Sequence, residues 1–426
     1  FLYSFELCKN LFKIFLFFFK ITFLKNFSNI NKNFKGKTII MSHLTNLNNF
    51  KKNIDTQYFG LEKEFGTKKS IFFYLDHINT SRNEKKNLLS IKRNIFINNY
   101  CIDILIYKKI LLNIFKEFFF IFVEIKKKNN FEKKFYLECT KYLVSLSTIK
   151  NNILYYNLEK LIIQNKTKNI LITLEGHPYE YLIFLLGKKY NINVYAYQTS
   201  YITKSHYSMF LNIGSNFLPT KILANGKIGF DYLKQKFNPS KVILLGSNKY
   251  NKKIKRKKTN NLNLLALPSA YEGEASEFIE LCNKCLKKNE NLKTKIIFRL
   301  HPQIDKLKFI NKHLKILNHE VRIKISDQNL IDDINLCKFA LYRSSSAIID
   351  ALQQGLIPIF LPQQKTNFQS DPLWQLKSKI IITNYEQLSR AINNKKHANK
   401  RKFLEYVNFA NNYYRPLNYK KLRNIT

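Results

Sequence analysis

The sequence predicts an α/β protein in which two domains are each built on a parallel sheet. The chain has 426 residues, which is enough for two or three domains at roughly 100–200 residues each. Short apolar runs alternate with longer helical patterns, as expected for parallel strands connected by helices. This alternation occurs twice, once on each side of the basic run NKKIKRKKTNN at residues 251–261. We therefore expect a cleft between two α/β halves.

The first half contains six runs that we expect to be strands and three that we expect to be helices. The strand runs are 38–41, 70–75, 169–174, 193–197, 221–223 and 242–245, and the helical runs are 107–123, 135–146 and 179–189.

The second half repeats the alternation with shorter spacing. The expected strands are 262–267, 295–299, 322–325, 339–342 and 357–361, and the expected helices are 275–288, 305–314, 329–335 and 345–354. Residues 386–426 read as helical and basic.

The resulting division has five parts. It comprises a hydrophobic and basic arm at 1–37, a first domain at 38–250, a basic linker at 251–261, a second domain at 262–385 and a basic helical tail at 386–426.

Composition excludes a disordered chain and indicates an anionic partner. Hydrophobic residues make up 45% of the chain, which is enough to build cores. Lys and Arg number 72 against 29 Asp and Glu, for a formal net charge of +43. Part of this excess fits the Lys-, Asn- and Ile-rich usage of an AT-rich genome. The remainder favours a negatively charged partner, which can be lipid head groups, an anionic sugar donor or both.

The apolar run at 11–24, LFKIFLFFFKITFL, is interrupted by two lysines. It is therefore shorter than the roughly 20 apolar residues that a membrane span needs. Two interpretations remain open, an interfacial helix with lysines at its edges and an arm buried on the protein.

Polar residues follow several expected strands, at the edge where open α/β sheets bind ligands. Arg299 ends one strand, and His301 follows it, with Pro302 stopping the strand. Ser344, Ser345 and Ser346 follow a later strand and precede a helix. An imidazole and a helix start lined with hydroxyls can together hold a phosphate, although a solvated turn and ordinary helix capping are the simpler alternatives.

In the first half, Glu175 and Gly176 follow the strand NILITL, and Pro178 opens the next helix. A carboxylate at this edge can deprotonate a hydroxyl, while a plain capping role is the alternative. Glu180 is placed to orient a neighbour. In the second half, Glu272 lies in the loop after the first strand, where it can touch a nucleotide. No pair of carboxylates marks a metal site, so we expect no metal.

These motifs resemble those of GT-B glycosyltransferases that build bacterial surface carbohydrates. Bacterial sialyltransferases of this fold carry an acidic-acidic-Gly motif, then His-Pro, then a serine motif. The corresponding positions are Glu175 and Gly176, His301 and Pro302, and the serines at 344–346, with Leu174 in place of the first acid. Capsule and teichoic-acid polymerases share the elements seen here as Arg299 to Pro302 and as the serines.

The resemblance implies two Rossmann-like domains facing a cleft, with an acceptor domain first and a nucleotide-sugar domain second. It implies an inverting, metal-independent transfer from a nucleotide-activated sugar, with CMP as the nucleotide of the sialyltransferases. Glu175 would be the base, and His301, Arg299 and the serines would bind the phosphate. The acceptor would be a carbohydrate or lipid-linked glycan at the inner face of the bacterial membrane, and the protein would be cytoplasmic or peripheral there.

Three alternatives remain. A CDP-glycerol-type polymerase and a nucleotide-sugar epimerase would use the same fold and the same phosphate-binding residues. A non-catalytic RNA-binding protein would instead use the basic run at 251–261 and the basic C-terminus. No aromatic residue is interleaved with that run, and stacking aromatics are typical of single-stranded RNA sites. We therefore expect no nucleic-acid partner.

Overall fold

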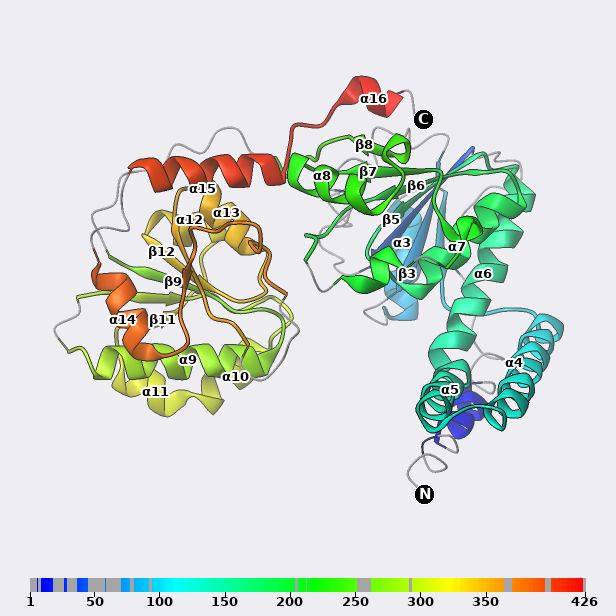
Figure 1. Cartoon of the computed structure of the whole chain (residues 1–426), viewed down its shortest axis with the longest axis horizontal. Coiled ribbons are helices and arrows are strands. Elements are labelled where there is room, and N and C mark those ends of the chain that lie inside the picture. The colour runs from blue at the N-terminus through cyan, green and yellow to red at the C-terminus, as the bar shows by residue number, and fades with distance from the viewer. Residues whose placement is uncertain are drawn as a thin grey trace.

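The computed structural model shows two α/β domains side by side (Figure 1). It describes residues 6, 9–17, 27–28, 37–44, 58, 70–76, 80–91, 94–203, 206–211, 213–250, 262–290, 293–363, 370–394 and 400–423. The basic run at 251–261 lies outside these residues. The prediction of two parallel-sheet domains is confirmed.

The first domain is built on an eight-stranded sheet of order β1-β4-β3-β2-β5-β6-β7-β8, in which only β1 is antiparallel to its neighbour. The strands are β1 (Phe27–Ser28), β2 (Thr38–Leu44), β3 (Ser70–Asp76), β4 (Ile95–Asn98), β5 (Asn169–Thr173), β6 (Asn193–Tyr197), β7 (Lys221–Ala224) and β8 (Val242–Leu244). All six expected strands are present, and β1 and β4 were not predicted. At the centre of the sheet β2 is buried along almost its whole length, which explains its continuous apolar run.

The helices of the first domain are α3 (Arg82–Ile91), α4 (Ile104–Ile125), α5 (Asn130–Leu143), α6 (Leu146–Asn165), α7 (Pro178–Lys189) and α8 (Lys227–Lys236). Among the described residues, the 3₁₀ turns that accompany them are η2 (Tyr207–Phe210), η3 (Ser215–Phe217) and η4 (Pro239–Lys241).

The sequence pattern did not predict α6, and the predicted helix that corresponds to α5 extends three residues beyond the end of α5 at Leu143. The side chain of Ser145 accepts a hydrogen bond from the amide of Thr148, so a new helix starts at the point where the expected helix of residues 135–146 was to end. The buried face of α6 also changes along its length. Ile149 and Ile153 pack against α4, whereas Leu158 and Leu161 pack under the sheet. A helix that is buried on different sides along its length shows no single apolar stripe.

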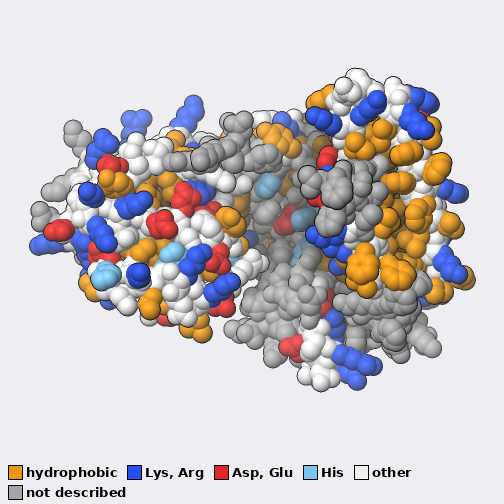
Figure 2. Space-filling view, turned by 90° about the horizontal axis from the view of Figure 1, so that it is seen from below, with side chains coloured by type: hydrophobic (Ala, Val, Ile, Leu, Met, Phe, Trp, Pro, Cys, Tyr) orange, Lys and Arg blue, Asp and Glu red, His pale blue; other side chains and the backbone are white. Residues whose placement is uncertain are grey.

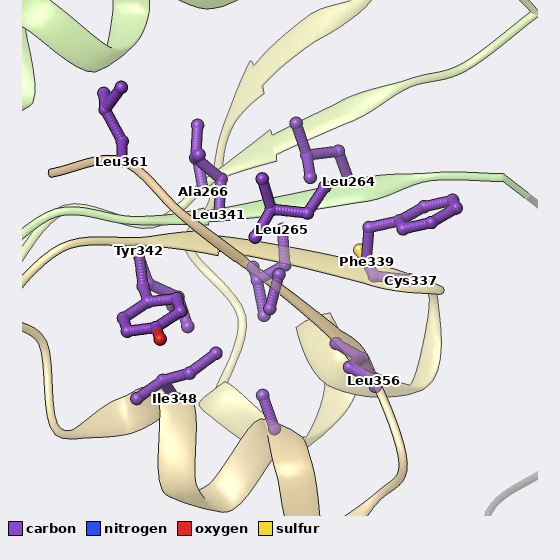
Figure 3. Packing of buried hydrophobic residues seen from close by; sticks show 14 of the residues in the cluster. Leu264, Leu265, Ala266, Cys337, Phe339, Leu341, Tyr342, Ile348, Leu356 and Leu361 are labelled. Carbon is purple, nitrogen blue, oxygen red and sulfur yellow. The ribbon is translucent and has the colours of Figure 1, made fainter. Parts of the chain in front are cut away.

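The second domain is built on six parallel strands of order β11-β10-β9-β12-β13-β14. The strands are β9 (Leu264–Leu267), β10 (Ile296–Phe298), β11 (Ile323–Ile325), β12 (Phe339–Tyr342), β13 (Ile357–Phe360) and β14 (Ile380–Ile381). Figure 3 shows apolar side chains on both faces of this sheet, with Tyr342 of β12 beside Ile348 of the following helix.

The helices around this sheet are α9 (Glu272–Lys287), α10 (Lys306–Lys312), α11 (Leu314–His319), α12 (Leu330–Asn335), α13 (Ala347–Gln353) and α14 (Tyr385–Asn393). Cys282 and Cys285 both lie on the buried face of α9.

The last two helices, α15 (Lys400–Tyr413) and α16 (Tyr419–Arg423), return the chain to the first domain. In Figure 1, α15 runs from above the second domain to α8, and α16 lies over the first domain. The backbone after α15 pairs with the first domain, because the Arg415 amide donates to the Asn225 carbonyl and the Ser247 amide donates to the Arg415 carbonyl. At Gly226 a Cβ would lie 1.9 Å from the Tyr413 carbonyl oxygen, so only glycine permits this close approach.

The described part of the N-terminal segment packs on the first domain through one face. Residues 9–17 are helical, and Ile14 and Phe17 are buried against Tyr107 and Ile110 of α4. Phe12 and Phe15 on the same helix are exposed. Residues 18–24 lie outside the described residues. None of the described helices combines the length and the apolar character needed to cross a membrane.

Candidate functional site

The first domain gathers titratable side chains at the carboxyl edge of its sheet. β2, β5 and β6 are neighbours in the sheet and run in the same direction. His43 lies near the end of β2, Glu175 follows β5, and Thr199 follows β6. The three side chains therefore meet at one edge, as the strand order requires.

Glu175 is held by two hydrogen bonds. Thr199 Oγ1 donates to Glu175 Oε1 at 2.7 Å, and His177 Nε2 lies 3.3 Å from Glu175 Oε2. Burial raises the pKa of Glu175, but the hydrogen bonds from His177 and Thr199 outweigh burial and leave that pKa below its usual value. The carboxylate is therefore ionised at neutral pH and can accept a proton.

The turn that carries Glu175 is fixed by Glu180, whose side chain is buried in α7. Its carboxylate accepts hydrogen bonds from the backbone amides of Glu175 at 3.0 Å and Gly176 at 2.8 Å. Gly176 has φ of +83°, and a Cβ there would lie 2.5 Å from the Met209 amide. Burial raises the pKa of Glu180 to about 7. Glu180 therefore orients the turn that carries Glu175, which agrees with the expectation that it orients a neighbour.

Two histidines extend this cluster. Tyr179 Oη lies 2.9 Å from His43 Nε2, and the rings of His177 and Tyr179 are stacked with centroids 5.3 Å apart. The hydrogen bond to Glu175 raises the pKa of His177. The sequence reading ended the strand before His43, whereas β2 continues to Leu44. The position of His43 beside β5 depends on the strand order, and the local sequence gives no signal for it.

In the second domain, the loops after β10, β9 and β12 lie next to one another. His301 belongs to the first of these loops, Ser269 to the second and Ser344 to the third. The sheet therefore brings the His-Pro and serine elements to one edge, on either side of the loop after β9.

The described hydrogen bonds of Ser344 connect it to a carboxylate that the sequence reading did not select. Ser344 Oγ donates to Glu274 Oε2 at 3.1 Å, and Ser269 Oγ donates to the same oxygen at 2.8 Å. The Ser269 amide donates to Glu274 Oε1 at 2.9 Å. Glu274 is buried. The sequence did contain a signal for this contact, since Glu274 falls on the apolar face of α9. A buried carboxylate needs hydrogen-bond donors around it, and the nearby serines can supply them.

The other two serines occupy different environments. Ser345 is buried, and Ser346 precedes α13 with helical backbone angles. Helix capping, the simpler alternative for the serine run, is not observed at Ser346. Ser346 makes no capping hydrogen bond within the described residues, because its own backbone is already helical and its hydroxyl does not reach the next turn.

Arg299 and His301 differ in the number of hydrogen bonds that their side chains make among the described residues. Arg299 Nη1 donates to the buried Asp333 at 2.8 Å and to the Gln328 carbonyl at 2.6 Å. His301 is half-buried, and its Nδ1 accepts from the Gln303 amide at 3.3 Å. Burial lowers the pKa of His301. A neutral ring with Nδ1 as acceptor carries its proton on Nε2, where it can donate to an anion.

Glu272 is directed toward a neighbouring helix. It lies at the start of α9, and its carboxylate accepts a hydrogen bond from Lys312 of α10 at 3.0 Å. Glu272 is half-buried and lies two residues before Glu274, the carboxylate that contacts the serine loop.

The two edges are connected directly. Tyr201 Oη, two residues after Thr199, donates to the Ser344 carbonyl at 2.6 Å. Nearby, Trp374 Nε1 of the second domain donates to the Ile202 carbonyl at 3.0 Å. The loop after β6 therefore touches both Glu175 and the serine loop, which places the two groups of polar residues on opposite sides of one interface.

Lys249 and Asp350, two half-buried groups of opposite charge, lie behind this contact. Lys249 Nζ donates to the Thr199 carbonyl at 3.4 Å. Burial lowers the pKa of Lys249 to about 8, and burial raises the pKa of Asp350 in α13 to about 6. Each group opposes the other's shift, so the attraction between the two domains partly offsets the cost of burying both charges.

Figure 2 shows a hollow between the two domains in which acidic and histidine side chains are visible. One wall carries a carboxylate and imidazoles that can exchange protons. The other carries the His301 imidazole, whose Nε2 can donate to an anion, beside the Ser269 and Ser344 hydroxyls that donate to Glu274. Such a pair of walls suits a reaction in which an alcohol is deprotonated on one side and an anionic group leaves on the other.

Comparisons with known proteins identify the architecture. No family model and no curated protein sequence matches the chain. Among solved structures, the glycosyltransferase SnogD from Streptomyces nogalater covers 92% of this chain, with 98% of its own length aligned, 9% identity and a TM-score of 0.53. MurG from Acinetobacter baumannii covers 91%, with 99% of its own length aligned, 12% identity and a TM-score of 0.51.

A third similar structure is the Listeria monocytogenes protein assigned as a UDP-N-acetylglucosamine 2-epimerase. It covers 89% of this chain, with 92% of its own length aligned, 13% identity and a TM-score of 0.50. At these identities the similarity concerns the fold. The chain has the two-domain GT-B fold found in glycosyltransferases, as the resemblance implied.

Proposed function

We propose that this protein is a glycosyltransferase that takes a sugar from a nucleotide donor and transfers it to an acceptor hydroxyl. The observation that carries the proposal is the pairing of two unlike walls across one interface. Glu175 is held by Thr199, and the same loop reaches Ser344 through Tyr201. The GT-B fold of the similar structures supports it, since SnogD is itself a glycosyltransferase.

In the proposed reaction the acceptor O–H gives its proton to Glu175, and the oxygen attacks the anomeric carbon of the donor. The bond between that carbon and the phosphate oxygen breaks, and its electron pair stays on the nucleotide. His301 donates from Nε2 to the departing phosphate, and backbone amides and hydroxyls near Ser345 and Ser346 add donors. Donors aimed at developing charge are commonly worth ~3–4 kcal/mol each.

The finer features of the proposal rest on the motif resemblance. We propose an inverting, metal-independent enzyme of bacterial surface polysaccharide synthesis, with a CMP-linked sugar as one candidate donor. Arg299 and Glu272 take supporting roles in nucleotide binding, with Arg299 acting through its anchor on Asp333. The acceptor is a carbohydrate or lipid-linked glycan, and the protein works on the anionic inner face of the membrane.

Thermal-shift measurements with CMP, CDP, UDP and GDP test the donor site. A ligand that binds only the folded state raises the melting temperature, so we expect one nucleotide to shift it. His301→Ala should abolish that shift, and His319→Ala, at the exposed end of α11, should retain it. No shift with any nucleotide, or an equal shift in both variants, would contradict the proposal.

An epimerase that converts the nucleotide sugar without an acceptor is the second candidate. The similarity in fold to the Listeria protein supports this candidate. The Glu175 carboxylate and the His177 and His43 imidazoles could also move a proton on the sugar itself. Incubation of the bound nucleotide sugar without acceptor separates the two candidates. Conversion to an isomeric nucleotide sugar indicates an epimerase, whereas nucleotide release that requires an acceptor indicates a transferase.

A further inference from the structure

The helices α4 and α5 form a hairpin that projects from the first domain, away from the second (Figure 1). The hairpin turns at residues 126–129. We define the hairpin tip as residues 119–135, which cover the end of α4, this turn and the start of α5.

The hairpin tip exposes an unusual concentration of large apolar side chains. In α4, a helix of 22 residues, the buried residues are Tyr107, Ile110 and Ile114. Figure 2 shows apolar side chains gathered over the end of the molecule that carries the hairpin. The exposed apolar residues of the tip, each 44–82% exposed, are Phe119, Phe120, Phe122, Val123, Phe131 and Phe135.

Lysines surround these apolar residues. Residues 104–143 contain nine lysines and four glutamates, for a net charge of +5. Three consecutive lysines, at 126–128, form the turn itself. Lys126 Nζ lies 5.7 Å from the centre of the Phe122 ring, and Lys128 Nζ lies 5.8 Å from that of Tyr136. Positive charge and aromatic surface are therefore placed together at the tip.

The hairpin is held in a defined position at its base and at its turn. Its base packs Tyr107, Ile110 and Ile114 against α6 and against residues 9–17. At the turn, Asn129 Oδ1 accepts from the Glu132 amide at 2.9 Å, and the Asn129 amide donates to Glu132 Oε2 at 3.3 Å. This capping box fixes where α5 starts. The apolar tip is thus presented by an ordered element.

The composition of the tip decides between a membrane span, a protein interface and a bilayer surface. α4 is interrupted by lysines and glutamates, and it is not apolar enough to cross a membrane. Cores of protein interfaces are depleted in lysine, whereas lysines beside aromatic residues are typical of elements that lie in the head-group region. The net positive charge complements anionic lipid.

We propose that the hairpin tip docks this protein on an anionic lipid bilayer, with its phenylalanines in the interfacial region and its lysines among the head groups. The proposal rests on the proposed function in one respect, since it places the enzyme at a surface where a lipid-linked acceptor is available. Docking itself depends on α4 and α5 alone.

Vesicle sedimentation with phosphatidylcholine, with and without phosphatidylglycerol, tests the apolar part. The wild-type protein should bind the anionic vesicles. The double variant Phe119→Ser, Phe120→Ser should lower the partition coefficient on the order of 100-fold, because each phenylalanine loses its transfer from water. The matched control, Leu307→Ser with Val321→Ser, alters apolar residues 75% exposed on the second domain and should bind as the wild type does.

Neutralising the turn tests the electrostatic part. Replacing Lys126, Lys127 and Lys128 by Gln should weaken binding to anionic vesicles on the order of 100-fold at low salt, and by much less at high salt. The control replaces Lys284, Lys287 and Lys288, three exposed lysines at the end of α9, by Gln. It should leave binding within about two-fold of the wild type.

The remaining outcomes contradict docking on lipid. If the wild type does not sediment with anionic vesicles, or if the tip and control variants bind equally, the hairpin is not a membrane element. If the tip variants instead convert a dimer to a monomer in sedimentation velocity without changing vesicle binding, a second copy of this chain covers the tip.

The nucleotide-dependent thermal shift of the same variants separates this test from the proposed function. The shift should persist in both tip variants, and its absence from the wild type would count against the donor site alone.

Discussion

The two walls of the cleft come from sheets of the same type but carry different chemistry. The first wall holds Glu175, His177 and His43, whose hydrogen bonds suit proton exchange, as do the shifted pKa values of Glu175 and His177. The second wall holds Ser269 and Ser344 around the buried Glu274, with His301 beside them. The candidate site therefore needs the edges of both sheets. The first wall is proposed to accept the proton and the second to bind the leaving phosphate, and the variants below test these two roles separately.

The largest effect should come from the proton-exchange wall. Glu175→Gln removes the proposed base while keeping a side chain that can accept from Thr199. We expect nucleotide release from the bound donor to slow by about 1,000-fold, with the nucleotide-dependent thermal shift unchanged. Glu290→Gln, an exposed position on the second domain, serves as the control. Turnover near the wild-type rate would remove the base role from Glu175.

The phosphate wall should show a smaller loss that includes binding. His301→Ala should slow turnover by roughly 100-fold and also reduce the thermal shift, because His301 is proposed to contact the nucleotide directly. Steady-state kinetics and thermal shift on the same preparation check this. If His301→Ala lowered only the rate and left nucleotide binding intact, the division between the walls would be wrong.

The turn beneath Glu175 should give a pH-dependent effect on stability. The pKa of Glu180 is about 7 in the fold against 4.5 for the ordinary group. Between these values the folded protein retains a proton that the unfolded chain has lost. Stability from this group is therefore fully present below pH 4.5, falls as the pH rises through 7, and then levels off. The expected fall is roughly 3–4 kcal/mol.

Urea unfolding of the wild type and of Glu180→Gln across this pH range measures the difference. The variant should lack the part of the decline that Glu180 contributes, because an amide does not titrate. Parallel curves for the two proteins would show that Glu180 keeps the same protonation state in the folded and unfolded chain.

The smallest effect should come from the contact between the walls. Tyr201→Phe removes the hydrogen bond to the Ser344 carbonyl and should lower the free energy of unfolding by about 1 kcal/mol. Tyr419→Phe, on α16, is the control and should leave it unchanged. An unchanged unfolding free energy in Tyr201→Phe would indicate that water replaces this contact without loss.

Local patterns predicted most of the strands but few of the contacts within the site. The run NILITL predicted β5 and placed Glu175 at its end, and FALY predicted β12 and placed Ser344 after it. Helix α6 was missed because its buried face changes between the hairpin and the sheet. Glu274 was missed in favour of Glu272, since the two carboxylates differ in burial and partner, which a linear pattern does not show.

By itself the sequence determined the alternation of strands and helices, the two-domain division and the residues that follow each strand, because apolar periodicity is a local property. Only the tertiary structure decided that His43 meets Tyr179, that Glu274 holds the serine loop, and that Tyr201 joins the two walls. These contacts join residues far apart in the chain, and they follow from strand order and from the packing of one domain against the other.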